Sequence, residues 1–478
     1  MTDSAGGTHE PAPKLVFNPR YLIAAALLFA CAFVVPKQLI LPMIALGIAA
    51  IVLSPLPLGT RGVIFAVMTG LATGIASINL FAIGIFQGPI TKEFGWSQTT
   101  YSLVILIGTI VTVISSLYIG KLFDRDGVRR WSIICTVLFA LALISLYWLT
   151  PNPLHFYAVF ALVPLIGAGT SSVAYSRVVA RWFDRRRGQA FGAALAGIGI
   201  GGAVLSSFTQ FLISEVGWRA AYVGLGALVL CVTLPIILWK LKDNPSDVGL
   251  GPDGEPPQHA ASVGGAPPVV IPPPLVGFTA AHTRRLPRFW QMLFAFLLLS
   301  FGIGGVMIPL VPILRASGVS AEDAATVLGA LSVALIVGRA FAGFLMDRLF
   351  APYVAAAILV FPIVGVTLLA LGVTGSTAIV AAACIGLAAG AELDVIAVLI
   401  TRYFGNLAYA ENYGWQYAAW TLGSGTAVIV TNIVYDRMGS HTPALWAYVV
   451  FFVVSALLVL RLGPYPKLPV APAATQPS

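Results

Sequence analysis

The chain has 478 residues, of which 58% are hydrophobic and only 9% are charged, and its mean hydropathy is +0.92. A soluble domain carries about 25% charged residues, so 27 Lys and Arg with 18 Asp and Glu cannot cover a water-facing surface of this size. The composition predicts a polytopic membrane protein and excludes a secreted disulfide scaffold, a disordered chain and an ordinary cytosolic enzyme. It also argues against nucleic-acid binding, despite the net charge of +9.

Cysteine and histidine give no sign of metal or redox chemistry. The four cysteines lie far apart in apolar stretches and form no CxxC motif. The five histidines fall in the tails or in predicted loops, so a proton relay inside the membrane must use carboxylates. We therefore expect no metal, no cofactor and no enzymatic activity.

Two short apolar runs, 21–35 and 39–54, come first, after a polar tail at 1–20. The first run resembles the hydrophobic region of a signal peptide. A second apolar run follows it at once, which favours a retained hairpin at 21–56 over a cleaved signal.

Twelve longer apolar runs follow, each near the ~20 residues that a helix needs to cross the hydrocarbon core. They are predicted at 63–87, 99–120, 132–150, 156–178, 189–213, 220–239, 289–313, 323–346, 352–372, 377–401, 413–435 and 443–461. Because these runs lack the alternation of a barrel strand, the predicted fold class is all-α. The prediction is 12 core transmembrane helices, or 14 with the hairpin.

Charge divides the chain into two sides. We assign most of the 27 basic residues to one side of the membrane, Arg339 to a span, and only Lys37, Lys92, Arg219, Arg315 and Arg437 to the other side. By the positive-inside rule the crowded side is cytosolic, and both termini lie there. We therefore expect a multi-pass protein of the cytoplasmic membrane.

The six spans at 57–242 and the six at 287–462 repeat each other, on either side of a Pro- and Gly-rich segment at 243–286 that is typical of a flexible cytosolic linker. A second tail follows at 463–478. The matches are Gly120 to Arg125 with Gly343 to Arg348, Arg181 to Phe183 with Arg402 to Phe404, and Phe191-Gly192 with Tyr413-Gly414. Three matches at nearly one offset indicate duplication of a six-helix unit. Since six is even, the two bundles are parallel copies about an axis along the membrane normal.

The loop after the second core span can act as a gate. A glycine lets two helices approach closely, and an Asp at a helix end beside several Arg can form a charge-assisted latch. The gating residues are Gly120, Asp124, Arg125, Gly127, Arg129 and Arg130, with Gly343, Asp347 and Arg348 in the second half. The alternative is a solvated charge cluster that merely follows the positive-inside rule.

With this loop the chain resembles the major facilitator superfamily of transporters over roughly residues 60–462. Further stretches resemble its monocarboxylate transporter and oxalate/formate antiporter branch: 93–97, 181–188, 245–254, 288–290, 390–394 and 402–405. The resemblance implies a secondary transporter in which two bundles rock about a site at the membrane midplane.

Three charged residues stand out in the interior of predicted spans: Arg339, Glu392 and Asp394. Arg339 precedes Asp347 by eight residues, or about 12 Å of helix, which places it near the midplane. Its planar fork suits a carboxylate, and the resemblance implies the same, because that branch uses an arginine in the eighth span. The alternative is a structural ion pair between Arg339 and Glu392, and the two roles can coexist.

Glu392 and Asp394 are roughly 200° apart around a helix, so both cannot point into one cavity. Either could carry a proton if buried. We favour Glu392, the deeper of the two, and expect Asp394 to pair elsewhere; a purely structural role is the alternative.

The chain departs from the branch in its charged residues. The lysines that the branch carries in the first or the eleventh span are absent, and Leu335 stands where an acid is expected four residues before Arg339. A single basic residue in the cavity favours a monoanion or an amphipathic acid over a dicarboxylate such as oxalate.

Polar and aromatic groups on the spans that line the cavity could complete the substrate site. They are Asn79, Gln87, Tyr101, Tyr175, Gln210, Gln416, Tyr417 and Trp420. The function we predict is alternating-access transport of a small, monocarboxylate-like organic anion, coupled to protons or to exchange with a counter-substrate. The alternative is proton-coupled efflux of amphipathic or cationic compounds, with Arg339 purely structural. The expected partners are the substrate and the lipid bilayer, with no nucleic acid, and we expect a monomer.

Overall fold

The computed structural model describes residues 56–256, 260–261, 269–270 and 275–470. The tail at 1–20 and the hairpin predicted at 21–56, apart from Leu56, lie outside the described residues. Nearly all the secondary structure of the described residues is helical, and the strands β1 (Ala260–Ala261) and β2 (Val269–Val270) have two residues each. The prediction of an all-helical membrane protein is confirmed, while the hairpin that would bring the total to 14 spans lies outside the description.

The first six predicted spans correspond to a series of helices with several local breaks. These are α3 (Leu58–Ala72), α4 (Ile75–Ser77), η1 (Ile78–Ala82), α5 (Ile83–Phe94), α6 (Gln98–Asp126), α7 (Val128–Ser145), η2 (Leu146–Trp148), α8 (Pro153–Ile166), η3 (Ala168–Thr170), α9 (Ser172–Trp182), α10 (Arg187–Leu228), η4 (Val229–Thr233) and α11 (Leu234–Lys240).

The last six spans are more regular. After the short α12 (Ala280–Thr283) come α13 (Pro287–Met307), α14 (Leu310–Ala316), α15 (Ala321–Met346), α16 (Ala351–Ala370), α17 (Gly375–Tyr403), α18 (Tyr409–Met438) and α19 (Thr442–Leu460).

Glycine explains two of the breaks. The first span is interrupted at Gly74, whose backbone is extended, and a Cβ there would collide with the carbonyl oxygens of Gly70 and Thr170. Gly217, with a φ of 82°, turns the chain inside α10 and so separates the fifth span from the sixth. A left-handed φ of this kind is accessible to glycine without steric cost.

Nine helical runs in the described part of the chain are long and apolar enough to cross a membrane. The run from Arg187 to Lys240 contains two predicted spans, and α8 is apolar but short. The long helix α18 is not among the nine, and it carries polar residues such as Gln416 and Ser424 inside the bundle. Polar residues on a spanning helix indicate that it faces protein or a cavity rather than lipid.

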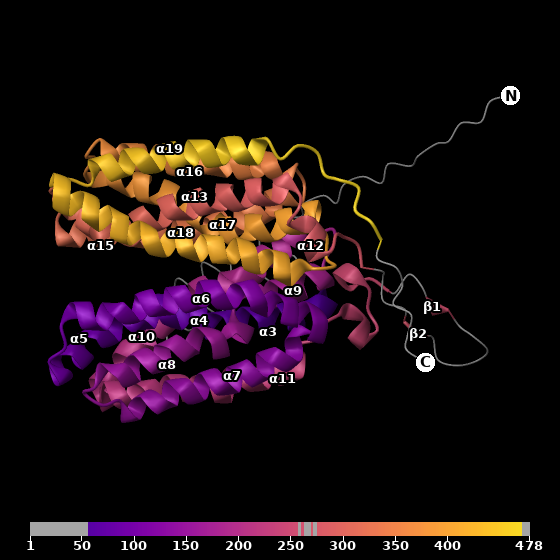
Figure 1. Cartoon of the computed structure of the whole chain (residues 1–478), viewed down its shortest axis with the longest axis horizontal. Helices are drawn as coiled ribbons and strands as arrows, with labels where there is room; N and C mark the ends of the chain where they lie inside the picture. Colours follow the sequence, from indigo (N-terminus) through magenta and orange to yellow (C-terminus); the bar gives the residue numbers. More distant parts are fainter. Residues whose placement is uncertain (1–55, 257–259, 262–268, 271–274, 471–478) are drawn as a thin grey trace, which may run out of the picture.

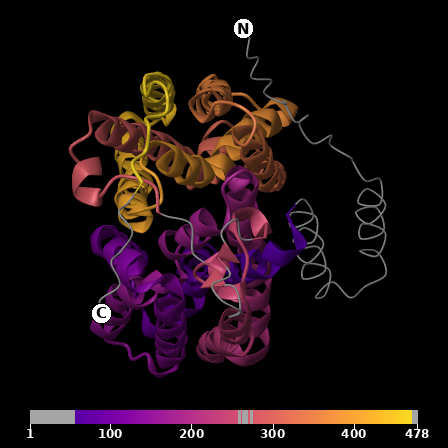
Figure 2. The ribbon, with the colours of Figure 1, turned by 90° about the vertical axis from the view of Figure 1, so that its right-hand side faces the viewer.

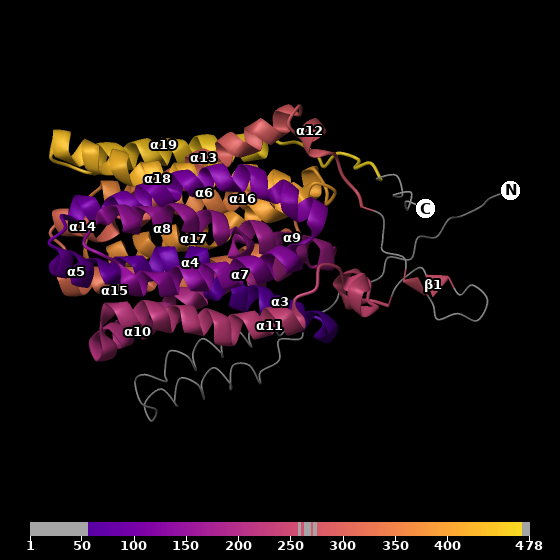
Figure 3. The same cartoon turned by 60° about the horizontal axis from the view of Figure 1, so that its bottom comes forward.

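The helices form two groups that lie side by side along the longest axis of the molecule. Helices α3 to α11 form the N-terminal bundle and α13 to α19 the C-terminal bundle (Figure 1), and the end-on view separates the same two groups (Figure 2). Their long helices run alongside one another (Figure 3). Two seams join the bundles, α6 with α18 and α10 with α15.

The linker begins as an ordered part of the N-terminal bundle. Two short helices, η5 (Pro245–Val248) and η6 (Pro252–Gly254), follow α11. One carboxylate oxygen of Asp243 accepts the backbone N–H groups of Val128 and Arg129, at 2.7 and 3.1 Å, where α7 begins. Asp253 accepts N–H groups from the loop before α10 (Asp184, Arg185 and Arg186) at 3.0 to 3.3 Å. Residues 243–255 thus pack on the N-terminal bundle, where carboxylates at loop and helix starts satisfy donors that would otherwise need water.

Candidate functional site

A large cavity lies between the two bundles. Its volume is about 730 Å³, and it is lined by α4, η1, α5, α6, α8, η3, α9 and α10 from one bundle and by α13, α15, α17 and α18 from the other. Because both bundles supply its walls, any relative movement of the bundles changes its shape.

The cavity occupies one half of the molecule's length. We call the end that carries Lys121, Arg125, Arg130, Arg185 and Arg348 the basic face. On α6 the lining residues stop at Ile119, whereas the helix continues toward the basic face as far as Asp126. On α15 they stop at Arg339, seven residues before the helix ends at Met346. The cavity thus extends from mid-helix away from the basic face.

Two carboxylates close the seams at the basic face. Asp124 of α6 accepts the backbone N–H groups of Ala410 and Glu411, at 3.2 and 2.9 Å, where α18 begins. Asp347, at the end of α15, accepts the N–H groups of Gly188 and Gln189, at 2.6 and 2.9 Å, where α10 begins. Each carboxylate therefore binds the positive end of a helix in the opposite bundle. Among the described residues, these hydrogen bonds hold the two bundles together at the basic face.

Glycines let the seams come together at these latches. A Cβ at Gly120 would collide with the backbone of Ala410, and one at Gly343 with the carbonyl of Gly188. Gly127, with a φ of 84°, makes the turn between α6 and α7.

The arginines predicted as gating residues contact other groups than the two latch carboxylates. Arg125 pairs with its neighbour Asp126 at 2.7 Å and is largely exposed. Arg129 donates to the carbonyl of Leu238 at 3.0 Å, and Arg130 is exposed. Arg348 lies over the Phe344 ring, 3.6 Å from its centroid.

The arginine that supports Asp124 was missed by the sequence interpretation. It is the buried Arg177 of α9, whose Nε donates to Asp124 at 2.9 Å. Its position in a predicted span near the membrane boundary made it look like one more member of the cytosolic basic set.

Arg339 lies on the floor of the cavity, with 4% of its surface exposed. Its Nε donates to the carbonyl of Gly390 at 2.9 Å, and its Nη1 donates to the carbonyl of Leu195 on α10, across the seam. Nη2 has no hydrogen-bond partner among the described residues. One edge of the guanidinium is therefore fixed by protein, while another nitrogen is left for a ligand.

The counter-ion of Arg339 is Asp394 rather than Glu392. Asp394 is fully buried, and its Oδ2 lies 3.5 Å from the Nε of Arg339. The sequence had offered an Arg339–Glu392 ion pair as the alternative; in the structure, Arg339 pairs with Asp394 instead. Neither oxygen of Asp394 has a hydrogen-bond partner within the described part of the chain.

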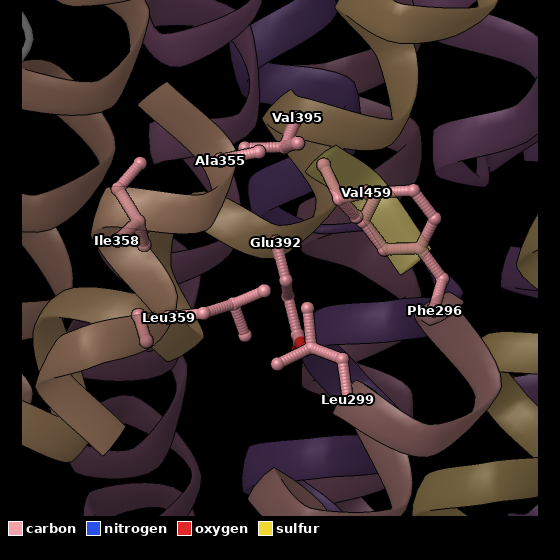
Figure 4. Close-up of a pocket in the computed structure, with 9 residues that line it drawn as sticks. Phe296, Leu299, Ala355, Ile358, Leu359, Glu392, Val395 and Val459 are labelled. Atoms are coloured by element: carbon pink, nitrogen blue, oxygen red, sulfur yellow. The ribbon is translucent and has the colours of Figure 1, made fainter. Parts of the chain in front are cut away.

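Glu392 borders two spaces at once. It lines the large cavity, and it also lines a small apolar chamber inside the C-terminal bundle. Its carboxyl end lies near Leu299 and Leu359 (Figure 4). Its Oε2 is buried without a hydrogen-bond partner among the described residues.

Of the other predicted substrate contacts, Asn79, Tyr417 and Trp420 line the cavity. The Oδ1 of Asn79 is buried without a hydrogen-bond partner within the described residues, whereas the indole N–H of Trp420 lies beside the Glu392 carboxyl. These two groups lie on opposite bundles.

The remaining predicted contacts lie away from the cavity lining. Tyr101 donates to the Ile83 carbonyl at 2.6 Å, and Tyr175 is hydrogen-bonded to Ser132 at 2.9 Å. Gln416 donates to the Phe289 carbonyl at 3.3 Å. Gln210 is exposed, and Gln87 lies on α5 without bordering the cavity. A tyrosine or amide in a spanning helix can satisfy a nearby protein group as well as a substrate, and the sequence does not distinguish the two.

Small hydroxyl residues line the cavity and were missed. They are Thr109, Thr112, Ser115, Ser116, Ser171, Ser172, Ser206, Ser332, Thr421 and Ser424. Several bond to their own helix, as Thr112 does to the Gly108 carbonyl at 2.7 Å. Ser172 and Thr421 have buried hydroxyl oxygens without partners among the described residues. Because serine and threonine satisfy themselves on helix carbonyls, they give no clear signal in an apolar run.

The walls of the cavity are otherwise largely apolar, with Val104, Phe160, Met307 and Leu328 among them. No group of three or more His, Cys, Asp or Glu residues that could hold a metal occurs in the described ranges. The arrangement is suited to hold a compound with one charged group and an apolar body.

A helical membrane protein with two bundles, a cavity between them and latches at one end has the architecture of a membrane transporter. Residues 69–428 match the model of the Major Facilitator Superfamily, and the chain belongs to this family. This confirms the family resemblance found in the sequence.

The relatives include monocarboxylate transporters. The chain is 30% identical to monocarboxylate transporter 12 of Xenopus laevis over 212 residues, which cover 41% of the chain and 43% of that protein. It is 25% identical to the uncharacterized MFS-type transporter YhjX of Escherichia coli, over 73% of the chain and 83% of that protein. The match thus spans less than half the length of the Xenopus relative.

A solved structure shares the fold. The Escherichia coli fucose:proton symporter superposes with a TM-score of 0.61 at 16% identity, covering 84% of this chain and 98% of that chain. At this identity the likeness concerns the fold alone.

Proposed function

We propose that the chain is a secondary active transporter of a small, monocarboxylate-like organic anion. The observation that carries this proposal is Arg339, which lies on the floor of the cavity between the bundles with Nη2 unoccupied. A guanidinium held on one side by backbone carbonyls offers a charge-assisted hydrogen bond to a carboxylate. The similarity to monocarboxylate transporter 12 supports the same substrate class.

The protein works by alternating access. The positive-inside rule makes the basic face cytosolic, with both termini on that side. The latches at Asp124 and Asp347 then close the cytosolic side, while the cavity lies in the outer half. Rocking of the bundles about the seams would break these latches and expose Arg339 to the cytosol.

Charge balance requires a partner for the anion. Arg339 and Asp394 together are neutral, so a monoanion would add one negative charge to a buried site. That charge is removed if a carboxyl group takes up a proton, or if one anion is exchanged for another. Glu392 and Asp394 are the two carboxyl groups at the site that could take up this proton.

A second function has its own support. Two carboxyl groups accompany a single guanidinium, and the walls are mostly apolar. Such a site could take an amphipathic or cationic compound against a carboxylate, with Arg339 as a structural counter-ion. This would be proton-coupled efflux.

Flux in liposomes separates the two functions. Uptake of labelled L-lactate, pyruvate and benzoate is measured for the wild type and for Arg339→Gln paired with Asp394→Asn. The double variant removes the guanidinium without leaving a buried carboxylate unpaired, which on its own would cost about 3–5 kcal/mol. Arg315→Gln, an exposed arginine at the far end of α14, is the matched control.

The anion proposal predicts that the double variant loses saturable uptake of all three acids, while Arg315→Gln retains it. Unimpaired flux in the double variant would remove Arg339 from the substrate site. Efflux of a lipophilic cation that survives in the double variant and fails in Glu392→Gln would favour the second function.

A further inference from the structure

A separate chamber inside the C-terminal bundle encloses the carboxyl group of Glu392. Its lining comes from α13, α16, α17 and α19 and includes Phe296, Leu299, Ile358, Leu359 and Val459, all apolar (Figure 4). The chamber has a volume of about 10 Å³, which leaves room for one water molecule at most. Glu392 is the one polar residue among its lining.

An ionised carboxylate is unfavourable in this chamber. Glu392 is 5% exposed, and its Oε2 has no hydrogen-bond partner among the described residues. None of the other lining side chains carries an N–H or O–H donor. A carboxyl group in such surroundings avoids the desolvation penalty by taking up a proton.

The charged and titratable groups around Glu392 do not remove this penalty. On α15, Arg339 is already engaged by Asp394 and by the carbonyls of Gly390 and Leu195. On its own helix, Asp394 projects roughly 200° away. From α18, Tyr417 lies at the cavity, and the indole N–H of Trp420 interacts with the Glu392 carboxyl, but the cost of burial is the larger effect. The chamber residues from α13, α16 and α19 are all uncharged.

Glu392 can nevertheless exchange protons with water, because it also lines the large cavity. A rotation about its side-chain bonds would carry the carboxyl from the chamber toward the cavity, where it could ionise.

We propose that Glu392 is the proton-binding site of the carrier, distinct from the Arg339–Asp394 pair that receives the anion. In the state seen here, a proton from the cavity binds the Glu392 carboxylate and the neutral acid turns into the chamber. After the bundles rock, the acid returns its proton to the water on the basic face and becomes a carboxylate again.

The charge of the site supports a stoichiometry of one proton for each anion. Without substrate, the Arg339–Asp394 pair is neutral and an ionised Glu392 contributes −1. With one monoanion bound and Glu392 protonated, the net charge is again −1. The carrier therefore crosses between its two states with the same charge, loaded or empty, and the complete cycle moves an anion and a proton together. This stoichiometry rests on the proposed anion function, whereas the proton site itself does not.

Infrared spectroscopy tests the proton site without any substrate. The purified full-length protein in lipid is titrated while the C=O stretching band of a protonated carboxylic acid is followed. We expect a band near neutral pH that is absent in Glu392→Gln and retained in Asp394→Asn. In Ala355→Ser, which adds a hydroxyl donor to the chamber wall, a larger fraction of the carboxyl is ionised at any given pH. A band that persists unchanged in Glu392→Gln would overturn the proposal.

Flux then tests the coupling. Wild-type liposomes take up labelled L-lactate with acidification of the lumen, and the rate rises by up to about tenfold for each unit fall in external pH, the mass-action limit for one proton. Glu392→Gln mimics the neutral acid, so it retains lactate–lactate exchange but loses lumen acidification and the pH dependence. Lumen acidification by this variant would overturn the proposal. If the wild type moves no monocarboxylate, the anion function fails, while the infrared result still decides whether Glu392 binds the proton.

Discussion

Replacing Asp347 by asparagine should open the basic face. The carboxylate of Asp347 accepts two backbone N–H groups of α10, and asparagine offers one carbonyl oxygen in their place. The loss of one charge-assisted hydrogen bond corresponds to about 1.5–3 kcal/mol. Each 1.4 kcal/mol is about a factor of ten, so the ratio of closed to open molecules should fall by about tenfold to a hundredfold.

The opening can be measured as a distance. Spin labels are attached to cysteines that replace Arg185 and Leu349, which lie on opposite bundles at the basic face. The four native cysteines are first removed. We expect a longer label-to-label distance to gain population in Asp347→Asn. The matched control is Asp323→Asn, because Asp323 is exposed at the other end of α15 and accepts a side-chain bond from Ser320. Equal distance distributions in Asp347→Asn and the wild type would refute the idea that Asp347 latches the bundles.

Three further changes have defined outcomes. Gly120→Val places a side chain against the Ala410 backbone and should reduce closure of the α6–α18 seam, measured as greater labelling of a cysteine at position 406 by a water-soluble thiol reagent. Asp253→Ala leaves the N–H groups of Asp184, Arg185 and Arg186 without their acceptor. We expect a loss of about 1–3 kcal/mol in unfolding free energy and faster proteolysis near residue 255. An unchanged denaturation midpoint would contradict this expectation. The hydrogen bond from Arg219 holds the pKa of Glu93 below its usual 4.5, so the pair stabilises the folded protein at neutral pH and this contribution is lost as the pH falls below 4.5. Glu93→Gln should therefore lower the Tm at pH 7 and change it little near pH 3; a similar decrease at both values would show that the charge is not the cause.

The sequence was informative wherever a pattern extends over many residues. Apolar runs located the helices, and the repeat of Gly120 to Arg125 in the second half led to both latches, because a duplicated motif keeps its place in the fold. The distance of Arg339 from Asp347 along one helix predicted a near-midplane position, and the structure places this residue in the lining of the cavity. These predictions depend on helix geometry, which is the same in every protein.

Side-chain partners were harder to predict, because they depend on how helices rotate against each other. Glu392 and Asp394 are two residues apart, and only the packing of α17 against α15 decides which one reaches Arg339. Tyr175 was expected at the substrate, but its hydroxyl meets Ser132 within the N-terminal bundle. The contacts of Asp243 and Asp253 with the N-terminal bundle were not predicted, because Pro, Gly and Asp also occur in segments without fixed structure.

In the proposed mechanism, the hydrogen bond between Arg339 and the Leu195 carbonyl couples substrate binding to the movement of the bundles. Arg339, which would bind an incoming carboxylate, also connects α15 to α10 across the seam through this hydrogen bond. The bond must break before the basic face can open. A bound carboxylate would give the guanidinium a further acceptor at the moment of release, in addition to Asp394. In the proposed mechanism, a bound carboxylate thus weakens a contact that holds the seam closed and favours opening of the basic face.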